Sequence, residues 1–148
     1  MHAKIFIALL FLAVHVKASS LELTNWVGRY PYSCDKRFQN VFEVPEVKKA
    51  LKKMLTRNEW KRLTDTYALT TPIQLIQDHL IVSCCKPHCC PCEHAMLVVD
   101  LKRERFHVGF YRGYYQDKTT IEWISSEGEF HDLPREIQEE FYFGHNAK

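Results

Sequence analysis

The sequence predicts a single α+β domain in which an antiparallel sheet of about five strands packs with short helices. Apolar residues recur at helical spacing in the segments 44–67 and 133–141. Between them, residues 73–124 contain short apolar, β-branched runs that are typical of strands. Of the 148 residues, 46% are hydrophobic, 26% are charged, and only 5 are Gly and 6 Pro. This composition excludes disordered, fibrous and low-complexity chains.

An apolar run near the N-terminus predicts export. The run, residues 5–16, has about 12 residues, which is shorter than the roughly 20 that a membrane-spanning helix needs. Lys4 precedes it, and Val16 and Ala18 place small residues at the alternate positions that signal peptidase accepts. We therefore expect residues 1–18 to be a cleaved signal peptide and residues 19–148 to form the domain. The first cysteine is Cys34, far beyond that cleavage site, so we expect no lipid or membrane anchor.

The charge balance argues against a nucleic-acid partner. Cleavage after Ala18 removes Lys4 and Lys17 from the 20 Lys and Arg residues, and the remaining 18 equal the 18 Asp and Glu residues. A mature chain of zero net charge is not a general binder of nucleic acid or of anionic membranes.

Two helices are predicted before the strands. The first begins near Pro45, which suits a first helical turn, and it turns one apolar face inward. Thr56 and Glu59 have the spacing of a capping box, so a second short helix should follow, with solvated Lys and Arg residues. The apolar positions of the two helices are Val44, Val47, Leu51, Met54 and Leu55, then Trp60, Leu63 and Tyr67.

Five strands and a closing helix complete the predicted domain. Asp78 and His79 are expected at a hairpin tip, and we expect the side chains of His79, His107 and His131 to be solvated. Asp132 is a suitable N-cap for the closing helix. The predicted strands cover residues 73–76, 80–83, 95–101, 106–110 and 120–123, and the apolar face of the closing helix is formed by Leu133, Ile137 and Phe141.

Five of the six cysteines lie in residues 84–92, here called the cysteine loop, which joins the second and third predicted strands. In an exported chain an even number of cysteines indicates disulfides, but spacing alone does not choose the pairs. A bond between Cys85 and Cys90 would close a short loop at low geometric cost. Pro87 restricts its own φ and the conformation of Lys86, so Lys86 and His88 are expected on a rigid projection that fits an acidic recess.

The run Cys85-Lys86-Pro87-His88-Cys89-Cys90 resembles the Cys-Lys-Pro-His-x-Cys signature of the inhibitor of vertebrate lysozyme (Ivy) family. The apolar strand over residues 94–100 and the run 121–124, with its Trp, are also similar to that family. The resemblance implies a periplasmic, non-enzymatic inhibitor without cofactors, whose disulfide-closed loop plugs the active-site cleft of C-type lysozymes. It makes His88 the residue that contacts the two catalytic carboxylates, with Lys86 and Pro87 shaping the loop, and it makes Cys85 and Cys90 the closing pair.

The sequence departs from the family pattern in its additional cysteines. The variable position of the signature is commonly acidic in the family, whereas here it is Cys89. Additional bridges, Cys84 to Cys89 or Cys34 to Cys92, therefore stay open at this stage. The target stays open as well, because an endogenous lytic transglycosylase also cleaves the glycan through a carboxyl acid and would accept the same plug. Since the family includes dimers, a homodimer is a further open alternative.

Two other functions compete with inhibition. The cysteine loop and His94 offer a dense set of soft metal ligands, but structural zinc sites usually gather two separated ligand pairs, and export favours disulfides. Cys89 and Cys92 have the C-x-x-C spacing of redox enzymes, yet a strand and not a helix is predicted to follow. Cys85 and His88 are too close in one tight loop to act as nucleophile and base. We therefore expect neither a metal site nor an enzyme.

Overall fold

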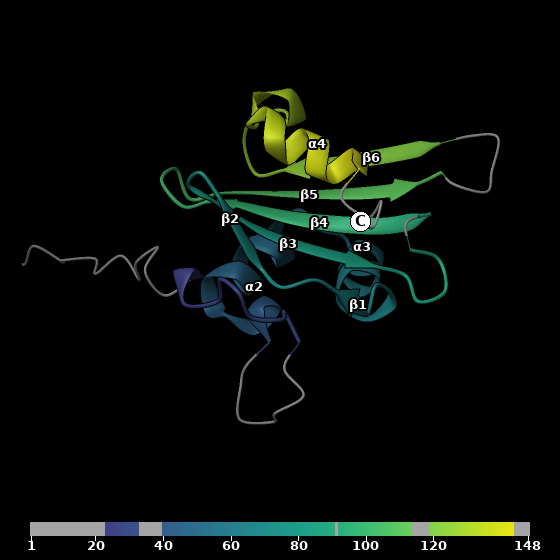
Figure 1. Ribbon diagram of the computed structural model, residues 1–148. Coiled ribbons are helices and arrows are strands. Elements are labelled where there is room, and N and C mark those ends of the chain that lie inside the picture. Colours follow the sequence, from purple (N-terminus) through teal and green to yellow (C-terminus); the bar gives the residue numbers. More distant parts are fainter. Residues whose placement is uncertain (1–22, 33–39, 91, 114–118, 144–148) are drawn as a thin grey trace, which may run out of the picture.

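An antiparallel six-stranded sheet forms the centre of the structure, a computed structural model that describes residues 23–32, 40–90, 92–113 and 119–143 (Figure 1). The order of the strands is β1-β3-β4-β5-β6, and β2 pairs with β3 beside β1. The bounds are β1 Leu69–Thr70, β2 Gln74–Ile76, β3 His79–Cys85, β4 Glu93–Asp100, β5 Arg105–Arg112 and β6 Thr120–Ser125. The predicted α+β class with an antiparallel sheet is confirmed, and the additional strand β1 has only two residues, too few for a sequence pattern.

The helices form where the local signals place them. Thr56 and Glu59 make the predicted capping box, in which each side chain binds the backbone N–H of the other residue. The prediction that Asp132 caps the last helix is wrong. Asp132 instead closes the preceding turn, where its carboxylate accepts a hydrogen bond from the N–H of Glu129 at 2.8 Å. The elements are η1 Val41–Glu43, α2 Pro45–Met54, α3 Arg57–Lys61, the π-helical turn η2 Arg62–Thr66, η3 Phe130–Asp132 and α4 Arg135–Phe143.

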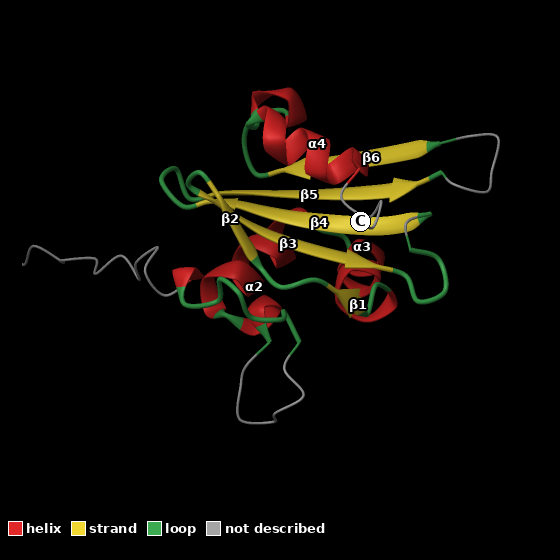
Figure 2. Ribbon diagram, viewed as in Figure 1, coloured by secondary structure: helices red, strands yellow, loops and turns green. Residues whose placement is uncertain are grey.

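Helices cover both faces of the sheet (Figure 2). One face, which carries Leu80, Leu97 and Val108, packs in the larger core with residues of α2 and η2. The other face, which carries Ile81 and Val98, packs against α4. Because successive residues of a strand point to opposite faces, β3 and β4 are buried on both sides, and their sequences read as almost continuous apolar runs.

The cover by α4 also explains a wrong prediction about two histidines. His79 and His107 were expected to be solvated, but only 8% and 4% of their surfaces are exposed, whereas His131 is exposed as predicted. The hairpin tip lies one residue earlier than predicted, at Gln77 and Asp78, so His79 begins β3 and is buried.

Within the described part of the chain, no helix has both the length and the apolar character to cross a membrane. The expected signal peptide, residues 1–18, lies outside the described residues.

Candidate functional site

The cysteine loop projects from one end of the sheet, between β3 and β4 (Figure 1). Its two flanking strands are hydrogen-bonded neighbours, with Cys85 opposite His94 in the register. The Lys86 N–H donates to the Glu93 carbonyl at 3.0 Å, which extends this pairing by one step into the loop. The base of the loop is therefore fixed by the sheet itself.

A tight turn places His88 at the tip of the loop. The Cys89 N–H donates to the Lys86 carbonyl at 3.0 Å, which closes a four-residue turn with Pro87 in its second position. His88 occupies the third position with φ +64°, the left-handed conformation that this position has in a type II turn. Proline and a positive φ in these two places define the turn, and the exposed His88 side chain points into solvent from it.

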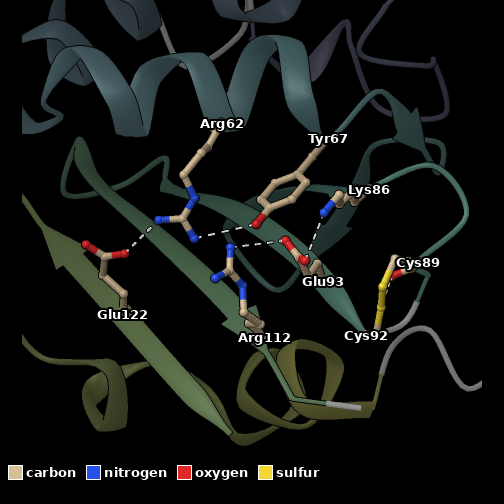
Figure 3. A network of polar contacts seen from close by, with 8 residues as sticks. All are labelled: Arg62, Tyr67, Lys86, Cys89, Cys92, Glu93, Arg112 and Glu122. Carbon is tan, nitrogen blue, oxygen red and sulfur yellow. Dashed lines mark hydrogen bonds and ion pairs between the residues drawn. A yellow bond between two sulfur atoms is a disulfide. The ribbon is translucent and has the colours of Figure 1, made fainter. Parts of the chain in front are cut away.

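Two disulfides constrain the loop. Cys85 is bonded to Cys90 with their Cα atoms 5.5 Å apart, the pair that the family resemblance implies. Cys89 is bonded to Cys92 with their Cα atoms 5.1 Å apart (Figure 3). This second bond rules out both additional bridges considered from the sequence, Cys84 to Cys89 and Cys34 to Cys92. Cys34 itself lies outside the described residues.

Cys84 is a free thiol on the opposite side of the strand from Cys85. It is fully buried, with its Sγ 3.6 Å from the Ala95 carbonyl oxygen. Burial raises the pKa of this thiol to about 12, because no water solvates the thiolate. Cys84 is therefore an unreactive core residue at neutral pH.

The loop residues that suggested a metal site are not assembled into one. Four of the cysteines are consumed in disulfides, and His94 is buried with its Nε2 2.7 Å from the Phe141 carbonyl oxygen. Among the residues that the structure describes, no three His, Cys, Asp or Glu side chains form a group that could hold a metal ion. The Cys89–Cys92 pair is followed by strand β4 and not by a helix N-terminus, so its thiols lack the dipole that activates redox cysteines.

A carboxylate at the base of the loop binds two cations (Figure 3). The Glu93 carboxylate is 3.0 Å from Lys86 Nζ and 3.4 Å from the Arg112 guanidinium. Burial acts to raise the pKa of Glu93, but the hydrogen bond from Lys86 and the charge of Arg112 outweigh it, so the pKa lies below its usual value. Lys86 thus points back to the sheet and ties the first residue of the turn to β4 and β5. Of the two side chains that the sequence placed on the projection, His88 is exposed at the tip, whereas Lys86 is partly covered and bound to Glu93.

A third cation, Arg62, lies beside this group, and its role was not predicted from the sequence. Arg62, expected to be solvated with the other basic residues of its helix, lies over the Phe110 ring at 4.3 Å. Its guanidinium is 3.0 Å from the Glu122 carboxylate and 3.5 Å from the Tyr67 hydroxyl (Figure 3). The sequence carries no local signal for this group, because its members come from η2, β5 and β6, which only the fold brings together.

Comparison with protein-family models identifies the family of the chain. Residues 46–141, well over half of the chain, match the family model described as inhibitor of vertebrate lysozyme (Ivy). The matched segment runs from α2 to α4 and contains the whole cysteine loop. Searches among curated proteins and among solved structures gave no match.

Proposed function

The chain belongs to the inhibitor of vertebrate lysozyme (Ivy) family, and we propose that it inhibits C-type lysozyme by inserting its cysteine loop into the active-site cleft. In this mechanism His88 enters between the two catalytic carboxyl groups, and the inhibitor turns over no substrate. The observation that carries the proposal is the position of His88, exposed at the tip of a turn that Pro87 and two disulfides constrain.

The chemistry of the target suits an imidazole. A retaining glycosidase holds one protonated and one ionised carboxyl group about 5 Å apart around the scissile bond. An imidazole between them donates a hydrogen bond to the carboxylate and occupies the space of the sugar. One ring nitrogen of an imidazole donates to the ionised carboxylate, and the other is close to the second carboxyl group.

The rigidity of the loop supports tight binding. A segment that is already held in its bound shape loses little conformational freedom on docking. Here the backbone bonds from Lys86 to Glu93 and from Cys89 to Lys86, together with the disulfides, hold the loop before any target arrives. Glu93 adds a side-chain contact to Lys86 at the same place.

Export is part of the proposal. Two disulfides in one loop form and persist in an oxidising compartment. We infer that residues 1–18 direct the chain to the periplasm, where the mature protein meets lysozyme and protects the cell wall.

The decisive experiment is a titration of C-type lysozyme activity on bacterial cell walls with the oxidised protein and its His88→Ala variant. We expect stoichiometric inhibition by the wild type and a loss of affinity of about 30-fold or more in the variant, as for a central interface residue. His131→Ala is the matched control, since His131 is also exposed but lies in η3, outside the loop. Equal inhibition by wild type and His88→Ala would refute the role of His88, and no inhibition by the wild type would refute the proposal as a whole.

A further inference from the structure

A small pocket opens next to the base of the cysteine loop, on the face of the sheet that α2 and η2 cover. It has a volume of about 220 Å³ and is lined by Arg62, Phe110, Arg112, Thr120 and Glu122. Pockets for drug-sized ligands start at roughly 300 Å³, so this one has room for a single side chain or another group of that size.

The lining selects an anion. Two of its residues, Arg62 and Arg112, are cations, and the one carboxylate among them, Glu122, is bound to Arg62 at 3.0 Å. Both guanidinium groups line the pocket, and Figure 3 shows Arg62 bound to Glu122 and Arg112 bound to Glu93. A carboxylate between two guanidiniums would relieve their mutual repulsion and accept hydrogen bonds from both.

Both arginines have donors left for such a ligand. Arg112 has an exposed side chain, and its contact with Glu93 is long, at 3.4 Å, so most of its five N–H groups face solvent or the pocket. Each terminal nitrogen of Arg62 carries two N–H groups, and the bonds to Glu122 and to Tyr67 use one of them on each nitrogen.

The pocket and the loop lie at the same end of the sheet. At this end of the sheet Cys85, the last residue of β3, pairs with His94. On the next two strands Glu93 pairs with Arg112, and Arg112 pairs with Thr120, the first residue of β6. Glu93 also joins them directly, because its carboxylate binds Lys86 of the loop and Arg112 of the pocket. A protein whose cleft receives the loop therefore brings the rim of that cleft toward the pocket.

We propose that the pocket between Arg62 and Arg112 is a second contact site, which binds the carboxylate of an acidic side chain on the rim of the target's cleft. This inference rests on the proposed function for the identity of the target. It assigns the two sites different tasks: His88 blocks the catalytic carboxyl groups, whereas the pocket fixes the orientation of the inhibitor and makes its binding depend on salt.

The test compares binding of C-type lysozyme at low and high salt. We expect Arg112→Gln to weaken binding about tenfold at low salt, the scale of one hydrogen bond to a charged group, and to flatten the salt dependence. Arg135→Gln is the matched control, because Arg135 is an exposed arginine in α4 on the other face of the sheet. Wild-type affinity and salt dependence in Arg112→Gln would overturn the proposal.

Because Arg112 also binds Glu93 at the base of the loop, Arg112→Gln changes both the pocket and the loop. A second pair of variants, at Thr120, changes the pocket alone. Thr120 lines the pocket at the start of β6 and is exposed, and Thr120→Glu places a carboxylate there within the chain itself. Glu and Gln have the same shape and differ in charge. We expect Thr120→Glu to weaken lysozyme binding clearly more than Thr120→Gln, because its carboxylate competes with the carboxylate of the target. Equal affinities of these two variants would mean that Arg112 acts only through the loop, which would also overturn the proposal.

A direct probe keeps this test separate from the failure of the plug. In NMR spectra of the ¹⁵N-labelled protein, acetate should shift the Arg112 Nε–H resonance saturably, and neutral acetamide should not. If the wild type does not bind lysozyme at all, the proposed function fails, yet an acetate-specific shift still supports a carboxylate site for another target. No difference between acetate and acetamide would refute the pocket itself.

Discussion

Lys86, the first residue of the tight turn, donates from its ammonium group to the carboxylate of Glu93, 3.0 Å away on the opposite strand. The same two residues are joined by a backbone hydrogen bond from the Lys86 N–H to the Glu93 carbonyl, also at 3.0 Å. A side-chain bond and a backbone bond thus hold Lys86 against β4, and His88 follows two residues later in the chain. We infer that these two bonds orient His88 and contribute little to the stability of the whole domain.

We therefore predict that Glu93→Gln weakens lysozyme inhibition several-fold while it lowers the free energy of unfolding by only about 1 kcal/mol, because both cations that bind Glu93 are half-exposed. The neutral amide keeps the volume of the side chain but loses the charge that binds Lys86 and Arg112. Inhibition titrations and urea unfolding measure the two effects. Amide hydrogen exchange at Cys89, whose N–H closes the turn, should become faster in the variant. An unchanged exchange rate combined with unchanged inhibition would contradict this role of Glu93.

The free thiol of Cys84 gives a second prediction. Because it is fully buried and its pKa is raised to about 12, it should not react with iodoacetamide in the native protein at pH 8. In denaturant without reductant it should be alkylated at once, whereas the four bonded cysteines stay protected. Peptide mass mapping in a Cys34→Ser background reads out the site, with Cys84→Ala as the unlabelled control. Native labelling of Cys84 would show that the core opens at this strand.

These examples show which parts of the molecule were visible in the sequence. The capping box of Thr56 and Glu59 was predictable because its partners are three residues apart. The restriction of the backbone at Lys86 and Pro87 was also predictable, because proline limits its own φ and the conformation of the residue before it. Glu93 and Arg112, in contrast, meet only through the pairing of β4 with β5, and their spacing in the chain carries no trace of it.

The buried histidines were missed for a different reason. His107 alternates with apolar residues, which indicates a strand with one solvated face, but α4 returns from the C-terminal end to cover that face. The cysteine pairing was open because every loop cysteine is close in sequence to several others. Only the fold distinguishes Cys84, which lies in the larger core, from Cys85, which is on the opposite face of the sheet.

Buried His107 leads to a prediction about pH. Burial lowers the pKa of His107, and the neighbouring His79 lowers it further, while Asp100 acts in the opposite direction. The unfolded chain then takes up a proton at His107 at a higher pH than the native protein does. The free energy of unfolding should therefore decrease as the pH falls from 7 through the ordinary histidine pKa of about 6.5 toward the lower native value.

Urea unfolding at pH 7.0 and 5.5 measures this change, in a range where most carboxylates stay ionised. The matched variant is His107→Gln, since a Gln amide can still bond to Ser125, whose hydroxyl lies 2.8 Å from His107 Nδ1, but does not titrate. We expect a smaller loss of stability between the two pH values in the variant than in the wild type. Equal losses in both proteins would show that His107 does not cause the pH dependence.

The last prediction concerns Gly109, which lies opposite Trp123 in the pairing of β5 with β6. A Cβ atom at position 109 would collide with the indole ring and with Phe141 of α4, so only glycine admits this aromatic packing. Trp123 packs edge-on against Phe141 with ring centroids 5.4 Å apart, which ties β6 to α4 across the glycine. We predict that Gly109→Ala lowers the free energy of unfolding by about 1 to 3 kcal/mol, as overpacking of a core does.

Chemical denaturation of Gly109→Ala, Trp123→Leu and the double variant forms a double-mutant cycle that tests whether the collision with Trp123 causes this loss. The smaller Leu should accommodate the methyl group, so the double variant should be more stable than the sum of the single effects implies, and strictly additive losses would place the strain elsewhere.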